Sequence, residues 1–174
     1  MTDQVLLSRT AESLYWLARY VERADSTARL IEMGYRMAML PGSRSAYEWR
    51  SVAAAAGCLD RFEDPEGITE AAIVRTLILD NDNPSSIRTC LERARANGRS
   101  VRTALTMQLW EVLNDGWRKL ELMDSNQVLR DLPGVLDWVK LRGATIRGAS
   151  TSTMLRNDNY LFLGLGGYIE RADM

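Results

Sequence analysis

The chain lacks histidine altogether and has only two cysteines among its 174 residues. Without histidine, the usual general base near neutral pH, the Ser-His and Cys-His nucleophile pairs and the commonest transition-metal ligand are all missing. Cys58 and Cys90 match no CxxC or zinc-binding spacing. We therefore expect two reduced, buried thiols and no catalytic residue of these familiar kinds.

Strong basic charge and long apolar runs are missing as well. The formal net charge is -1, so no overall basic field attracts nucleic acid. Residues 160–169 form the most apolar late stretch, about half the length of a membrane-crossing helix. The N-terminus has neither the basic region nor the apolar run of a signal peptide. These absences predict a cytoplasmic protein that binds neither nucleic acid nor membrane.

Proline is scarce, with four residues, and no segment shows strand-like alternation. Apolar residues make up 46% of the chain, enough for the core of one domain. We predict a single all-α domain over residues 1–174, a roughly antiparallel bundle of about six helices. The expected helices cover residues 8–40, 46–56, 69–79, 84 to beyond 101 with a kink or restart at 106, 133 to about 150, and 158 onward.

Polar residues and prolines mark the expected helix starts. Thr69 and Asn157 are predicted caps, and Asn83 is predicted to cap a helix whose first residue is Pro84. A turn is predicted around residues 125–126, Ser-Asn. These boundaries separate the helices that carry the polar residues of interest.

A hexapeptide occurs twice in the chain. Residues 20–25, Tyr-Val-Glu-Arg-Ala-Asp, return as residues 168–173 with isoleucine in place of valine. The copies lie 148 residues apart (170 minus 22), far beyond the periods of short repeats. We infer duplication of a large half within a longer helical protein, C-terminally truncated where the first copy continues. Self-association through the apolar surface meant for the missing helices is expected.

The first copy places a carboxylate on the apolar face of its helix. Asp25 lies inside this face and Glu22 at its edge, where a carboxylate is unfavourable unless it is paired. Arg29 is the predicted partner of Asp25, and Arg19 that of Glu22. Arg23 points to the opposite side, towards another partner. The apolar face itself consists of Leu14, Leu17, Val21, Ala24, Ala28 and Ile31.

The second copy repeats the carboxylates but not their neighbours. Glu170 and Asp173 are the repeated acids, and Asp173 is expected to face inward. Gly167 stands where the first copy has Arg19, and Gly164 stands where it has a tryptophan. Glu170 therefore has no arginine three residues earlier, so it either pairs across the bundle or binds something. Close helix packing explains these glycines better than phosphate binding, because no strand precedes them.

Two interpretations of the repeat are open, besides a general polar ligand or partner site. In the first, the two helices cross near a pseudo-twofold axis, and the Glu-Arg pairs of both copies form a reciprocal buried ion network. In the second, the two E-x-x-D pairs converge and hold Mg²⁺ or Mn²⁺; no other cofactor is expected. The candidate ligand or ion-network residues are Arg19, Glu22, Arg23, Asp25, Arg29, Glu170, Arg171 and Asp173.

Several segments carry a resemblance to a known family. They are residues 14–25, which open with Leu-Tyr-Trp-Leu-Ala-Arg, and residues 82–87, 109–114, 153–156 and 168–173. Together they resemble the bacterial alpha-E proteins, all-helical domains named for a glutamate-arginine motif, over nearly the whole chain. One departure is the Gly-Leu-Gly-Gly of residues 164–167, where the family tends to show an arginine.

The resemblance implies a family of longer, all-helical proteins with no established activity. It also implies a genomic association with circularly permuted ATP-grasp ligases and transglutaminase-like proteases, hence a role in making, modifying or trimming an amide-linked peptide. We expect an accessory protein that binds such a partner or its peptide and has no catalysis of its own. The alternative is a carboxylate-based enzyme or divalent-metal site built on the two Glu-Arg-Ala-Asp motifs.

Overall fold

The computed structural model describes residues 8–173, which fold into helices joined by short turns. This part of the chain contains eight α-helices and no strand. The all-α prediction is confirmed, although it undercounted the helices. None of the helices in residues 8–173 is long and apolar enough to cross a membrane. The α-helices are α1 (Ser8–Ala38), α2 (Ser45–Ala55), α3 (Glu70–Ile73), α4 (Ile87–Ser100), α5 (Met107–Glu121), α6 (Ser125–Arg130), α7 (Leu132–Thr153) and α8 (Asp158–Asp173).

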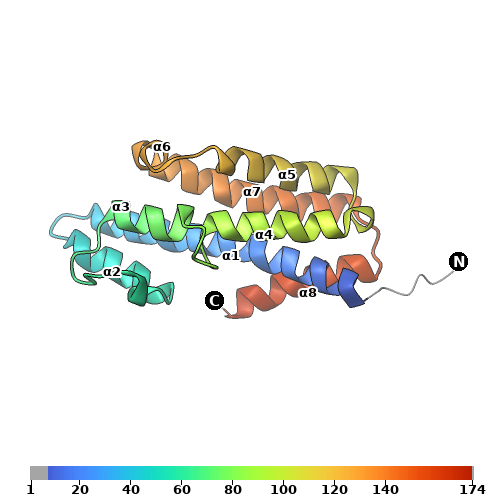
Figure 1. The fold of residues 1–174 in the computed structure, drawn as a ribbon, viewed down its shortest axis with the longest axis horizontal. Coiled ribbons are helices and arrows are strands. Elements are labelled where there is room, and N and C mark those ends of the chain that lie inside the picture. Colours follow the sequence, from blue (N-terminus) through green and yellow to red (C-terminus); the bar gives the residue numbers. More distant parts are fainter. Residues whose placement is uncertain (1–7, 174) are drawn as a thin grey trace, which may run out of the picture.

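The longest helix, α1, is the centre of the bundle and packs against α8, α4, α7 and α2. Figure 1 shows α4, α5 and α7 aligned lengthwise with it, and α8 beside its N-terminal half. The helix α8 runs in the same direction as α1, because Gly166 lies on Tyr15 and Glu170 lies between Arg19 and Arg23. This parallel pair brings the two hexapeptides to the same level of the bundle.

The apolar face predicted for α1 forms part of the core. All six of its residues are at most 3% exposed. The N-terminal half of the face joins a cluster with Leu109, Leu113 and Ile146, and the C-terminal half joins a second cluster around Trp49. Because both clusters include α1, the helix is held rigidly along its length, and so are the polar side chains that it carries.

Most predicted helix boundaries agree with the structure. Thr69 and Asn157 accept hydrogen bonds from the first turns of α3 and α8, as N-caps do. The predicted cap at Asn83 was wrong: α4 begins three residues later, and Ser86 is its cap. The Asn83 side chain instead donates to the carbonyl of Thr76 and accepts from the loop.

The turn predicted around residues 125–126 lies just before them, at residues 122–124, and residues 125–126 open α6, a helix that was not predicted. Asp124 caps this helix, and Gln127 returns a hydrogen bond to the Asp124 backbone. This reciprocal pair is a capping box, which explains why the chain resumes a helix immediately. Beyond α6, Asp131 caps α7 and the proline lies in its first turn.

Both cysteines are buried and free, as predicted. Burial raises the pKa of Cys90 to about 12 and raises the pKa of Cys58 as well. A thiol with a raised pKa carries little thiolate at neutral pH and reacts slowly. These two side chains therefore belong to the packing of the core.

Candidate functional site

The contact between α1 and α8 joins the two hexapeptides through their glutamates. Glu22 and Glu170 are 4% and 2% exposed. Arg171 donates from Nε and Nη2 to Glu22, at 2.9 and 3.0 Å. Arg23 donates in the same two-pronged way to Glu170, at 2.5 and 3.1 Å. Each copy thus supplies a buried carboxylate to the arginine of the other, and the arrangement is reciprocal.

The Glu170 end of this network is closed by α1 itself. Arg19 donates to Glu170 and to Asp173, both at 2.5 Å. The Arg19 guanidinium lies 5.3 Å from the ring centre of Trp16 and 5.7 Å from that of Tyr15, within the range of cation–π attraction. Two arginines therefore bind the Glu170 carboxylate, and two aromatic rings pack on one of them, Arg19.

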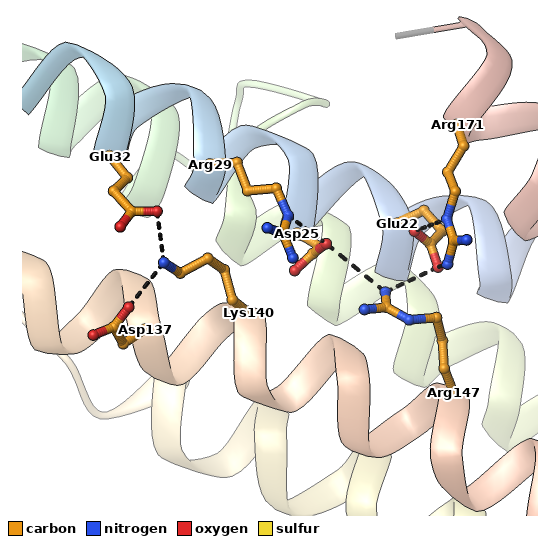
Figure 2. A network of polar contacts seen from close by, with 8 residues as sticks. All are labelled: Glu22, Asp25, Arg29, Glu32, Asp137, Lys140, Arg147 and Arg171. Carbon is orange, nitrogen blue, oxygen red and sulfur yellow. Dashed lines mark hydrogen bonds and ion pairs between the residues drawn. The ribbon is translucent and has the colours of Figure 1, made fainter.

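The Glu22 end uses a residue that the sequence did not indicate. Arg147 on α7 donates to Glu22 at 3.0 Å and lies 3.8 Å from Asp25. Asp25 also accepts a hydrogen bond from Arg29 at 3.0 Å, which is the predicted i, i+4 pair. Figure 2 shows these carboxylates and guanidinium groups meeting between α1 and α7. The polar contact therefore spans three helices at this end.

A second group of charges continues the polar contact along α1 and α7. Lys140 lies 2.6 Å from Glu32 and 2.8 Å from Asp137 (Figure 2). The hydrogen bond from Lys140 is the main reason why the pKa of Glu32 is below its usual value. The pair of Lys140 with Glu32 joins α7 to α1, and so it helps to place Arg147.

The pKa shifts follow the same reciprocal contacts. Burial alone would raise the pKa of Glu170, but the hydrogen bonds and charges of Arg23 and Arg19 outweigh burial and hold that pKa below its usual value. The hydrogen bonds to Glu170 raise the pKa of both arginines. Glu22 likewise raises the pKa of Arg171. The network is thus strongly ionic.

Several sequence-based expectations about these residues were wrong. Arg19 does not pair with Glu22 but reaches across to Glu170. Asp173 does not face inward like Asp25: its side chain is 56% exposed, against 7%. The reason is that α8 packs mainly on α1, so the outer side of α8 faces solvent, whereas neighbouring helices surround α1.

The four carboxylates of the repeat do not form a metal-binding cluster. Residues 8–173 contain no group of three or more acidic or cysteine side chains placed to hold an ion. Instead, every one of these carboxylates contacts at least one arginine. Guanidinium groups so close to the oxygens would repel a divalent cation. The geometry favours the ion network over the magnesium or manganese site.

A groove of about 240 Å³ lies between α1, α7 and α8 at the Glu22 end. Glu22, Arg147 and Arg171 line it, and so do Gly164 and Gly167. The sequence could have indicated this opening, because these glycines replace a tryptophan and an arginine of the first copy. They were expected to pack helices closely, a role that only Gly166 fills, since a Cβ there would overlap the Tyr15 backbone.

Comparison with known proteins identifies one family. The family model described as "Alpha-E: A predicted alpha-helical domain with a conserved ER motif" matches residues 6–174. No curated protein and no solved structure matches the chain significantly. The duplicated Glu-Arg dipeptides fit the glutamate-arginine motif of that description, and the match covers nearly the whole chain.

Proposed function

Since this chain belongs to the Alpha-E family, we propose that it is an accessory binding protein with no catalysis of its own. Its partner is an enzyme that makes or trims amide bonds, of the ATP-grasp or transglutaminase-like kind, or the peptide which that enzyme handles. The family's glutamate-arginine motif then serves as a structural lock, and binding takes place on the surfaces that the lock holds in position.

The observation that carries this proposal is the occupation of both motif glutamates by arginine. Glu22 accepts three hydrogen bonds, from Arg147 and Arg171. Glu170 also accepts three, from Arg19 and Arg23. A general base needs a free oxygen within reach of the substrate proton. Carboxylates that are already engaged in this way are suited to holding α1 and α8 together.

Association and rate measurements with a purified partner enzyme test the proposal. We expect the chain to co-sediment with an ATP-grasp ligase or a transglutaminase-like protease and to change its rate of amide formation or cleavage. The chain alone is the control: it should turn over neither ATP nor peptide, and its sedimentation also reports the expected self-association. The proposal would be overturned if the chain showed no association with either enzyme and changed the rate of neither.

The carboxylate-enzyme or metal alternative is tested on the same sample. Elemental analysis and thermal unfolding with Mg²⁺ and Mn²⁺ should show no bound metal and no shift of the melting temperature. A stoichiometric metal, or a shift that disappears in the Glu22→Gln variant, would favour the alternative and count against a purely structural lock.

A further inference from the structure

The groove at the Glu22 end has an apolar floor and a charged wall. Leu17, Ile146 and Leu163 lie buried in the floor, and Glu22 and Arg171 belong to the wall. The volume of about 240 Å³ is below the roughly 300 Å³ at the lower end of pockets for drug-sized ligands. The groove therefore suits a fragment of the size of one amino-acid residue.

The groove is present because two side chains of the first copy have no counterpart in the second. On α1, Trp16 and Arg19 fill the equivalent place and stack on each other. On α8, these positions are Gly164 and Gly167. A Cβ on Gly167 would lie 3.6 Å from the nearest atom of Glu22, and a Cβ on Gly164 would have one neighbour, at 3.8 Å. The fold thus has room for side chains that the sequence does not supply.

The charge of the groove wall favours an anion. Arg147 and Arg171 both line the groove and both bind Glu22. Their side chains remain 31% and 51% exposed, so part of each side chain is accessible to a ligand. Asp25 is closer to Arg29, at 3.0 Å, than to Arg147, at 3.8 Å. Two guanidinium groups therefore face one carboxylate, and a second carboxylate would balance them through the fork geometry that arginine offers.

The remaining lining residues suit the rest of such a ligand. Ser150 and Thr151 place hydroxyl groups along α7, and Tyr160 and Tyr168 place aromatic rings along α8. Aromatic rings favour apolar or aromatic contacts, while hydroxyl groups can hydrogen-bond an amide. A cation is disfavoured by the two arginines.

We propose that this groove binds a monocarboxylate with an apolar or aromatic arm, the chemistry of a peptide's C-terminal residue. The carboxylate contacts Arg147 and Arg171, and the arm lies on the floor over Leu17 and Ile146. The identification of the natural ligand as a peptide rests on the proposed function, because the partner enzyme's peptide presents this group. The binding of the acid itself follows from the groove alone.

Titration calorimetry with N-acetyl-L-phenylalanine and with its uncharged amide tests the groove on the unmodified protein. We expect the acid to bind with a Kd on the order of 1 mM. The amide should bind at least about tenfold more weakly, because it cannot make charge-assisted hydrogen bonds to the arginines. Equal affinity for acid and amide, or no heat from either, would overturn the proposal.

Filling the groove gives a second, independent test. Gly164→Leu places a side chain over the floor and should weaken binding of the acid about tenfold or more. Gly148→Leu is the matched control: it adds the same side chain on α7, where no atom lies within 4 Å, outside the groove lining. Both variants are checked by circular dichroism. Unchanged affinity in a folded Gly164→Leu protein, or equal loss in the control, would contradict the assignment.

The failure of this inference is distinguishable from the failure of the proposed function. If the chain binds no acid but still associates with the partner enzyme, the ligand-binding role of the groove is rejected and the accessory role is retained. If the chain binds the acid at the groove but associates with neither enzyme, the ligand-binding role of the groove is supported and the proposed partner is rejected. The acid-amide titration and the sedimentation experiment therefore answer separate questions.

Discussion

The two ends of the ion network use the same hexapeptide but differ in how they are enclosed. At the Glu170 end, Arg19 and Arg23 bind the carboxylate, aromatic rings pack on Arg19, and two acids face two arginines. At the Glu22 end, glycines on α8 leave a groove, and two acids face three arginines. One end is closed and neutral, while the other is open and positively charged.

This difference distinguishes the residues that hold the helices together from those that we assign to ligand binding. The reciprocal pairs, Arg171 with Glu22 and Arg23 with Glu170, are common to both ends, so they account for holding α1 against α8. Features found at only one end are not needed to hold the two helices together. The open glycine positions and Arg147 belong to the Glu22 end alone, and they are the features that we assign to ligand binding.

The largest expected effect distinguishes the two glutamates. Glu170→Gln should lower the free energy of unfolding by about 3 kcal/mol, because it leaves the largely buried Arg23 without a counter-ion and leaves Arg19 with only the exposed Asp173. Glu22→Gln should lower it by only about 1 kcal/mol, because Arg147 and Arg171 are more exposed and can regain water. Denaturant unfolding of both variants provides the measurement. Equal losses would mean that the two ends are energetically symmetric.

The second prediction compares adjacent glycines of α8. Gly166→Ala should destabilise the fold by about 2 kcal/mol, because the new Cβ would overlap the carbonyl of Tyr15 and push the helices apart. Gly167→Ala meets Glu22 only at ordinary contact distance and should be stabilising by up to about 1 kcal/mol through helix propensity. Thermal unfolding measures both. If alanine at position 166 left the stability unchanged, α8 would not pack as tightly against the backbone of Tyr15 as the structure indicates.

Local features of the network were predictable from the sequence. The apolar face of α1 followed from the helical period, and the Asp25–Arg29 pair followed from i, i+4 spacing on one helix. The reciprocal arrangement was one of the open interpretations, since both hexapeptides carry the same Glu-Arg pair, and two such pairs on adjacent helices can exchange partners. Each of these inferences depends only on one helix or on the repeat itself.

Features that depend on the packing of several helices were not predictable. Arg147 lies 125 residues from Glu22 along the chain, and only the rotation of α7 brings it into contact. The exposure of Asp173 depends on which sides of α8 are covered, which its sequence does not record. The repeat suggested equal burial for Asp25 and Asp173, but the surroundings of the two helices differ.

The pH dependence of stability should also differ between the wild-type chain and a variant that lacks the charge of Glu170. The pKa of Glu170 in the folded protein is below its usual value, which is about 4.3 in an unfolded chain. Its contribution to stability is therefore complete above that unfolded value and is lost as the pH falls through the folded pKa. The gap in unfolding free energy between the wild-type chain and Glu170→Gln should narrow on acidification in this range.

Urea unfolding at a series of pH values from neutral to acidic measures this gap. Other acids with lowered pKa values, such as Glu32 and Asp137, are present in both proteins. Their contributions to the pH dependence therefore cancel in the difference between the two unfolding free energies. A gap that stays constant down to the acid transition would mean that the charge of Glu170 does not contribute in the folded state.

The smallest expected effect concerns the aspartates that end the two hexapeptides. Asp25 is buried, and one of its carboxylate oxygens, Oδ1, has no hydrogen-bond partner among the described residues. Asp25→Asn keeps the oxygen that accepts from Arg29 and removes a buried charge, so it should change the free energy of unfolding by less than about 1 kcal/mol. Asp173→Asn alters a pair whose acid is mostly exposed and should stay within about 0.5 kcal/mol. Denaturant unfolding of both variants decides the matter: a loss at Asp173 larger than the loss at Asp25 would mean that the exposed contact with Arg19, rather than burial, determines the strength of the closed end.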